Sequence, residues 1–259
     1  MLSKTQISWV RSLHRKKERD QQNVFIAEGT KTAEDVILSD ISIHSIFATQ
    51  EWLDKNEKQI EKRCSKCFVV DEKELERISC LTAPNQVLMV LDKKINSLPD
   101  PSKLQGLTLL VDGIQDPGNL GTIIRTADWF GVENIICSET TVELWNPKVI
   151  QATMGSFLRV NVFYSDKIIN WISQVSDKTN VYGAMMQGND LGKESMNRNA
   201  ILVLGSEAQG ISKEMQNHIT HPLTIPLFKN ESKNNPDSLN VSIAASIFMW
   251  HYNHEKSRD

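Results

Sequence analysis

The chain has 259 residues, of which 40% are hydrophobic and 24% charged, and its formal net charge at pH 7 is −3. This composition is typical of a globular protein with one or two domains, and the overall charge excludes a protein that coats nucleic acid with its whole surface. The apolar runs are too short for a transmembrane helix or a secretory signal, and four cysteines are too few for a disulfide framework. We therefore expect a protein of the reducing cytoplasm, without a membrane span.

The first hundred residues alternate helical and strand patterns. An amphipathic helix with Ile7, Val10 and Leu13 on one face begins the series. Strands are predicted at 23–27, 45–48, 68–70 and 86–91, and helices between them at 30–38, 52–63 and 72–78, with Thr30 and Asp71 as N-caps. Short connections between alternating elements predict a small α/β/α domain.

The first 20 residues carry six cationic and two acidic side chains, a net charge of +4. Such a cluster is either a solvated helix face or a binding site for the phosphates of RNA or DNA. The candidate RNA-binding residues are Arg11, Arg15, Lys16 and Lys17.

A cysteine pair follows in the same half of the chain. Cys64 and Cys67 have the C-x-x-C spacing, which occurs in zinc sites and in redox motifs. No second pair follows at the spacing that a zinc site needs. We therefore expect no metal site and assign no function to the pair.

Residues 97–102, Ser-Leu-Pro-Asp-Pro-Ser, have the composition of a linker. We predict a first domain at 1–97, a linker at 98–106 and a second domain at 107–259. In the second domain, strands are predicted at 107–111, 134–137, 160–163, 181–185 and 201–204, and helices at 120–130, after Asn146-Pro147 and at 240–251. Strands that alternate with helices predict a mostly parallel sheet.

The first of these strands runs into a glycine-bearing turn, Asp112-Gly-Ile-Gln-Asp-Pro-Gly-Asn-Leu-Gly121. Such a turn often binds phosphate, but these glycines do not form G-x-G-x-x-G, and Pro117 stiffens the loop. A Rossmann-type nucleotide-dependent enzyme is therefore a weak alternative. The helix that follows carries Asn119 and Arg125, which bring more polar chemistry than helix packing requires. Without a function, the turn would be a capped helix start with a surface arginine.

Two later segments, 201–210 and 225–245, each place a pair of polar residues beside an apolar strand or helix. Taken singly, each segment could be a simple turn or a helix cap. The four polar residues are Ser206, Glu207, Ser238 and Asn240.

The order and combination of these segments resemble the SpoU (TrmH) family of RNA ribose 2′-O-methyltransferases, in the SPOUT superfamily. The family's three motifs are similar to 116–121 with Arg125, to 204–210, and to 225–227 followed by 238–244. Residues 13–17 and 25–29 are similar to the RNA-binding domain that precedes the catalytic domain in many members. The resemblance covers nearly the whole chain, with one departure: 228–237 is longer than the family's usual turn.

The resemblance implies a mostly parallel SPOUT sheet with a C-terminal trefoil knot, preceded by a small α/β/α RNA-binding domain. It implies S-adenosylmethionine as the methyl donor and structured RNA as the substrate, with ribosomal RNA favoured over transfer RNA. The implied cofactor-binding residues are Leu204, Gly205, Ile225, Pro226, Leu227 and Leu239. The implied catalytic residues are Arg125, Asn119, Glu207, Ser238 and Asn240. An RNA-binding protein without catalysis is a further alternative, which the presence of Asn119, Arg125, Glu207 and Asn240 disfavours.

The chemistry of the reaction limits the role of Arg125. In this family, the corresponding arginine is often assigned a catalytic role, sometimes as the base. A guanidinium stays protonated at any working pH, so it suits holding a phosphate or stabilising a forming alkoxide better than removing a proton. The identity of the base therefore stays open.

The final helix predicts a homodimer. Val241, Ala244, Ala245 and Phe248 form one face at helical spacing, but further apolar residues extend around the cylinder. A helix that is apolar nearly all round is normally buried on more than one side, either by a second copy of the chain or by the N-terminal domain. The family resemblance favours the second copy.

Overall fold

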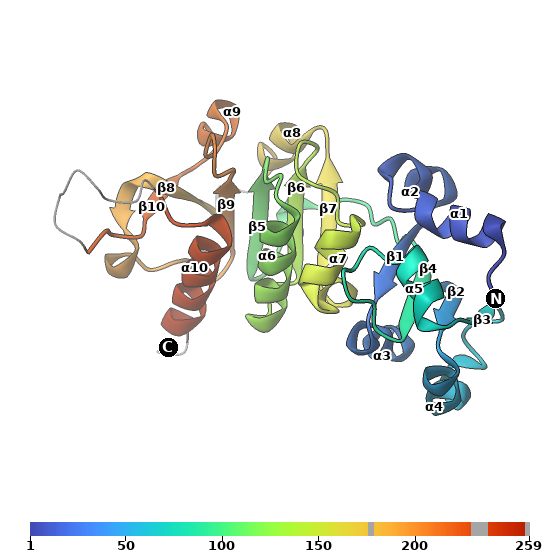
Figure 1. Cartoon of the computed structure of the whole chain (residues 1–259). Helices are drawn as coiled ribbons and strands as arrows, with labels where there is room; N and C mark the ends of the chain where they lie inside the picture. Colours follow the sequence, from blue (N-terminus) through green and yellow to red (C-terminus); the bar gives the residue numbers. More distant parts are fainter. Residues whose placement is uncertain (176–178, 229–237, 257–259) are drawn as a thin grey trace. The chain divides into compact units, whose positions relative to one another are not determined.

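The computed structural model describes residues 1–175, 179–228 and 238–256, with the side chains of 255 and 256 left aside. These residues form two units (Figure 1). The first consists of Met1–Ile95 and Glu143–Leu158, and the second of Asn96–Val142 and Arg159–Asp259. The domain bounds expected from the sequence stay a prediction, and they differ from the two units mainly in the placement of 143–158. Among the described helices, none has the length and apolar character to cross a membrane.

The first unit is built on a four-stranded sheet in the order β1-β4-β2-β3. Its strands are β1 (Val24–Glu28), β2 (Ile43–Ala48), β3 (Cys67–Val69) and β4 (Val87–Asp92). β4 pairs antiparallel with β1 and β2, and β2 pairs parallel with β3. Because helices cover both faces, the residues of β1 and β4 are buried almost throughout.

The helices of the first unit are α1 (Lys4–Ser12), α2 (Lys16–Gln22), α3 (Thr30–Leu38), α4 (Gln50–Ile60), α5 (Glu72–Ile78) and α7 (Pro147–Thr153). α1 and α5 share one core cluster with alternate strand residues such as Ile26 and Leu88. α3 and α7 also contact β1. Phe25, next to Ile26 in β1, points to the opposite face of the sheet because side chains alternate along a strand. The unit therefore has the three α/β/α layers that the sequence predicts.

The segment that contains α7 lies between two strands of the second unit in sequence, yet it packs in the first. The rings of Trp145 and Phe157 contact Phe25 of β1, with centroid distances of 4.4 and 5.8 Å. Arg19 of α2, whose side chain is 2% exposed, forms an ion pair with Glu143 of the same segment. The first unit therefore completes its core with residues that follow it by about 50 positions in the chain.

The second unit is built on a six-stranded sheet in the order β10-β8-β9-β5-β6-β7. All of its neighbouring strands pair parallel. The strands are β5 (Leu107–Asp112), β6 (Asn134–Ser138), β7 (Asn161–Ser165), β8 (Asn180–Asp190), β9 (Ala200–Gly205) and β10 (His221–Thr224). At the carboxyl edge, Asp112 of β5 stands in register with Gly205 of β9. The loops that follow these two strands therefore start side by side.

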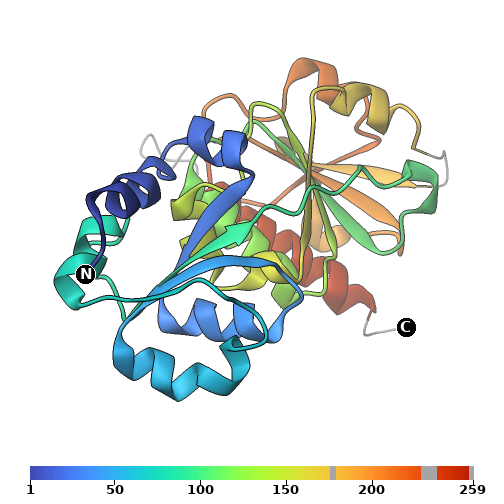
Figure 2. The same ribbon diagram turned by 90° about the vertical axis from the view of Figure 1, so that its right-hand side faces the viewer.

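Helices cover both faces of this sheet, as Figure 2 shows. They are α6 (Pro117–Trp129), α8 (Ile168–Ile172), α9 (Lys213–Gln216) and α10 (Val241–Lys256). α8 and α9 share a core cluster with Leu110, Ile136 and Val203 of the central strands. α6 and α10 contact each other on the opposite face. The mostly parallel α/β architecture predicted from the sequence is thus confirmed, whereas the trefoil knot stays a prediction.

Most predicted elements are present within a few residues of their predicted bounds. Asp71 caps α5 and Asn146 caps α7, as the sequence predicts. The prediction for Thr30 is wrong: it is the first residue of α3, and the N-cap is Gly29, whose positive φ of 95° suits glycine. The sequence also missed α2, α8, α9 and β10, which have only four to seven residues; α5 and α7, also seven residues long, were predicted from their N-cap residues rather than from periodicity.

The C-x-x-C pair lies in the first unit, where Cys64 is buried and Cys67 exposed as a residue. The Cys67 thiol donates to the carbonyl of Cys64, with an Sγ–O distance of 3.8 Å. In the described part of the chain, metal-binding side chains do not gather in groups of three or more. Partial burial and the neighbouring Cys64 thiol raise the pKa of Cys67 to about 11.

This pKa predicts slow alkylation of Cys67. Because the thiolate is the reactive form and its fraction falls tenfold for each unit of pKa, we expect iodoacetamide at pH 8 to react about 100-fold more slowly than with a free cysteine. The rate should rise as the pH approaches the raised pKa. Peptide mapping by mass spectrometry over a time course measures it, and a rate equal to that of a cysteine-containing control peptide contradicts the assignment.

Candidate functional site

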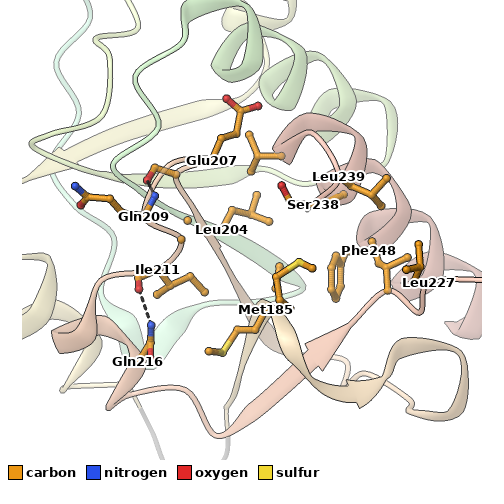
Figure 3. Close-up of a pocket in the computed structure, with 18 of the residues that line it drawn as sticks. Met185, Leu204, Glu207, Gln209, Ile211, Gln216, Leu227, Ser238, Leu239 and Phe248 are labelled. Atoms are coloured by element: carbon orange, nitrogen blue, oxygen red, sulfur yellow. Dashed lines mark hydrogen bonds between the residues drawn. The ribbon is translucent and has the colours of Figure 1, made fainter. Parts of the chain in front are cut away.

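A pocket of about 450 Å³ opens in the second unit, beside β8 and at the carboxyl end of β9 (Figure 3). Met185, Leu204 and Phe248 give it an apolar wall, and the start of α10 closes one side. All six residues predicted to bind a cofactor line this pocket: Leu204, Gly205, Ile225, Pro226, Leu227 and Leu239. The polar residues Glu207 and Ser238 line it as well.

Gly205 lets the chain turn back on itself at the pocket. Ser206 and Gly210 exchange two backbone hydrogen bonds, with N–O distances of 3.1 and 2.8 Å, so the loop closes directly over Gly205. A Cβ placed on Gly205 would overlap the backbone of Gly210 and Ile211. Backbone atoms cannot give way as a flexible side chain can, so only glycine fits at this position.

The C-terminal end of this loop is hydrogen-bonded to the neighbouring strand. Asp112 at the end of β5 accepts a hydrogen bond from the backbone N–H of Ser212 at 2.8 Å. Gln216 of α9 donates to the carbonyl of Ile211 at 2.7 Å, a contact drawn in Figure 3. Because β5 and β9 are paired in register, these contacts hold the loop at both ends.

A cluster of three polar side chains lies beside the pocket, and its members come from three segments far apart in sequence. Asn119 and Asn240 both donate through Nδ2 to Oε1 of Glu207 at 2.8 Å. Asn240 Nδ2 also approaches Oδ1 of Asn119 at 2.9 Å. Among the described residues, the other carboxylate oxygen of Glu207, Oε2, accepts no hydrogen bond. The cluster therefore presents a fixed anionic oxygen beside an apolar pocket.

Helix capping holds two members of this cluster in place. Asp116 is the N-cap of α6 and accepts from the backbone N–H of Asn119 at 2.8 Å. Oδ1 of Asn240 accepts from the backbone N–H groups of Ser242 and Ile243 at the start of α10. Each asparagine is thus fixed by the first turn of its own helix, and its amide group can be aimed at Glu207.

The same capping explains why the glycine turn is a poor phosphate site. The Asp116 carboxylate already occupies the N-terminus of α6, where a bound phosphate would have to sit. The N–H of Gly113 donates to the hydroxyls of Ser138 and Thr141. With these donors taken and a carboxylate in place, a second anion is repelled. This geometry disfavours the nucleotide-binding alternative.

Arg125 does not join this cluster. It lies two turns into α6 with an exposed side chain. Among the described residues, its guanidinium forms no hydrogen bond or ion pair. The structure thus brings together three of the five predicted catalytic residues, Asn119, Glu207 and Asn240. Ser238 lies on the pocket wall, and Arg125 lies apart from the cluster on its helix.

Sequence reasoning missed several pocket residues that were within its reach. Met185 ends a predicted strand, and the carboxyl ends of parallel strands are where ligands bind. Phe248 follows Val241 at helical spacing on the buried face of α10, so it could have been placed beside Leu239. The extra loop 228–237 lies outside the described residues except for Phe228.

The predicted RNA-binding residues fall into two groups within the first unit. Arg11 and Arg15 line a second hollow, of about 390 Å³, along α1. Lys16 and Lys17 are exposed at the start of α2 and do not line it.

Two family models match the chain. One, described as the SpoU rRNA Methylase family, matches residues 106–250. The other, described as an MRM3-like substrate binding domain, matches residues 4–89. The first match covers more than half of the chain and includes the pocket and the polar cluster.

Individual proteins are similar over nearly the full length. The 23S rRNA (guanosine(2553)-2′-O)-methyltransferase RlmP of Bacillus subtilis is 27% identical over 246 residues, which span 93% of both chains. A TrmH-family structure from Porphyromonas gingivalis is 33% identical, with a TM-score of 0.82 and coverage of 98% of this chain and 99% of that one. An AdoMet-bound rRNA methyltransferase from Sinorhizobium meliloti is 25% identical, with a TM-score of 0.85 and coverage of 98% and 97%. The chain belongs to the SpoU rRNA methylase family and is an RNA methyltransferase.

Proposed function

We propose that this methyltransferase transfers a methyl group from S-adenosylmethionine to a ribose 2′-hydroxyl of ribosomal RNA. The observation that carries the proposal is the Asn119–Glu207–Asn240 cluster, which holds a carboxylate beside an apolar pocket. The similarity to a 23S rRNA 2′-O-methyltransferase and to an AdoMet-bound rRNA methyltransferase supports the same reaction. We also propose a cytoplasmic location, which the free cysteines of the described residues support.

The pocket fits the methyl donor in size and in chemistry. Its volume of about 450 Å³ lies within the usual range for small-molecule sites. Leu204, Ile225 and Leu239 would hold the donor with apolar surface, and the side-chain-free backbone at Gly205 would let it approach closely. When bound, S-adenosylmethionine supplies a methyl group activated by a positively charged sulfur.

Glu207 is the residue that we assign to orienting the substrate hydroxyl. A ribose 2′-hydroxyl is a poor nucleophile, so its oxygen must be aimed at the methyl group and its proton must be drawn away. Two amides fix Oε1 of Glu207, and Oε2 is left without a hydrogen bond among the described residues. That oxygen can accept the hydrogen bond of the hydroxyl without any rearrangement of the cluster.

Arg125 supplies positive charge rather than a base. Its guanidinium stays protonated, which excludes proton removal but suits a phosphate beside the target ribose and the alkoxide that forms there. Because the side chain is exposed and has no partner in the described part of the chain, it is available to the RNA.

The exposed apolar residues of α10 support a homodimer. Phe248 faces the interior and is 1% exposed, whereas Ile243 and Trp250 of the same helix are 51% and 53% exposed. On α6, Trp129 is 85% exposed and lies one turn after Arg125. A second copy can cover such a surface through a self-complementary contact. In this dimer the interface borders Arg125, and the site is complete only when two chains are present.

The Ile243→Asp variant tests the dimer. A buried, unpaired carboxylate at the interface opposes association strongly, so we expect a monomer with little or no methyl transfer. Light scattering at the assay concentration gives the mass. Leu38→Asp is the matched control, because Leu38 is an exposed leucine, 85% accessible, in the first unit. An Ile243→Asp variant that stays dimeric and active, or a wild-type monomer that is active, would contradict the proposal.

Methyl transfer to isolated RNA tests the function itself. The protein is incubated with tritiated S-adenosylmethionine and either ribosomal or transfer RNA, and the product is digested to nucleosides for mass spectrometry. We expect label in 2′-O-methylated nucleosides of the ribosomal RNA. Label in a base, or in transfer RNA alone, would refute the proposed position or the proposed substrate.

A further inference from the structure

A cationic cleft runs between α1 and α5 of the first unit. Its volume is about 390 Å³. Four basic side chains line it, together with the hydroxyls of Ser8 and Ser12 and the buried Ile7. Three of the basic residues come from α1 and the turn after it, and the fourth comes from α5; they are Lys4, Arg11, Arg15 and Arg77. None of the lining residues is acidic.

Most of these cations lack a counter-charge. Lys4, Arg11 and Arg77 form no hydrogen bond or ion pair through their side chains within the described residues. Other cations of this unit are used internally: Arg63, for example, donates to three backbone carbonyls, and Lys93 pairs with Asp20. Like charges gathered in one hollow repel one another, and an anion bound among them relieves the repulsion.

Two acidic groups close in sequence to the cleft residues, Glu18 and Glu74, do not line the cleft. Glu18 pairs with Arg15 at 3.3 Å, but the Arg15 side chain stays 71% exposed. Glu74, one turn before Arg77 on α5, accepts hydrogen bonds from the backbone N–H groups of Leu2 and Asp71. Its carboxylate is therefore already used in contacts within the first unit. The cleft therefore keeps a net positive charge.

We propose that this cleft binds a phosphodiester group of the RNA substrate, with Arg77 as an anchor on α5 opposite Arg11 on α1. The proposal rests on the proposed function, since it assumes that RNA is the substrate. A phosphodiester presents two anionic oxygens, which the planar donor groups of arginines can grip from two sides, and serine hydroxyls add neutral donors. Because the cleft is concave, it favours a single backbone phosphate as its ligand over a flat acidic surface.

The decisive variant is Arg77→Ala. Its matched control is Lys55→Ala on α4, which also removes one exposed cation. Binding of an in vitro 23S rRNA transcript is measured by filter retention at several KCl concentrations. We expect Arg77→Ala to weaken binding about tenfold, as for loss of a charge-assisted hydrogen bond, and to lower the logarithmic salt slope by about 1. Arg11→Ala should act in the same way, and Arg77→Lys should keep the slope while losing part of the affinity.

Kinetics separate binding from misfolding. The KM for RNA should rise with Arg77→Ala, whereas kcat at saturating RNA, the affinity for S-adenosylmethionine and the melting temperature should match wild type. If Arg77→Ala keeps the wild-type affinity for RNA and the wild-type salt slope, the cleft proposal is overturned. The proposed function still stands in that case, provided that the wild-type protein methylates the transcript. Wild-type protein that neither binds nor methylates the transcript defeats the proposed function instead. Binding to anionic phosphatidylglycerol vesicles that is lost in the variant, with RNA binding unchanged, would assign the cleft to a membrane surface and also overturn the proposal.

Discussion

Arg125→Ala is expected to lower kcat for methyl transfer by about 10²–10³, the usual loss when one charge-stabilising donor is removed from an active site. The donor acts on charge that develops only as the oxygen attacks the methyl group, so the loss should appear in kcat. The Asn119–Glu207–Asn240 cluster does not include Arg125, and the pocket is not lined by it. Calorimetry should therefore find unchanged affinity for S-adenosylmethionine.

Two further variants define the role of this arginine. Arg125→Lys keeps a point charge but not the planar donor group, so it should recover part of the rate. Arg198→Ala is the matched control, because Arg198 is another exposed arginine of the second unit. If Arg125→Ala transfers the methyl group at nearly the wild-type rate in single-turnover assays, Arg125 has no role in the mechanism.

The second large effect is expected from Gly205→Trp, which should abolish binding of S-adenosylmethionine. Any Cβ at this position overlaps the backbone of Gly210 and Ile211, so the loop over the pocket must move, and an indole would also fill the pocket. Gly205→Ala should show a graded loss, because it displaces the loop without filling the space. Isothermal calorimetry on folded protein measures both.

Gly192→Ala controls for the loss of a glycine. A Cβ on Gly192 meets only the Asp190 carboxylate, at 3.4 Å, and this turn does not line the pocket. Its affinity for the methyl donor should equal that of wild type. If Gly205→Trp folds and still binds S-adenosylmethionine, the pocket at the end of β9 is not the cofactor site.

The candidate site was largely predictable from sequence because its residues lie in motifs that end strands or begin helices. Gly205 follows a buried strand, and Asn119 and Asn240 stand at helix starts, so a parallel sheet brings them to one edge. The direct hydrogen bonds from both asparagines to one oxygen of Glu207 were not predictable. They depend on the positions of α6 and α10, and no sequence pattern specifies those positions.

Other features were beyond sequence reasoning for identifiable physical reasons. Arg77 lies more than 60 positions after Arg11, and only the packing of α5 beside α1 places both in one cleft. The helix α7 was predicted from Asn146-Pro147, but nothing in its periodicity indicates which sheet its apolar face covers. That Arg125 has no partner among the described residues likewise follows from the surroundings of α6 rather than from its motif.

The use of residues 143–158 in the first unit also fixes an order of events during protein synthesis. On the ribosome, the face of β1 that carries Phe25 is covered only in part, by α3, until Trp145 and Phe157 have been made. About 60 residues separate the end of the first stretch of this unit from the end of the second, and at about 5–20 residues per second they take about 3–12 s to translate. During that interval an apolar strand surface is open to chaperones or to other nascent chains. Although it contains the N-terminus, this unit cannot finish folding before part of the second unit has been translated.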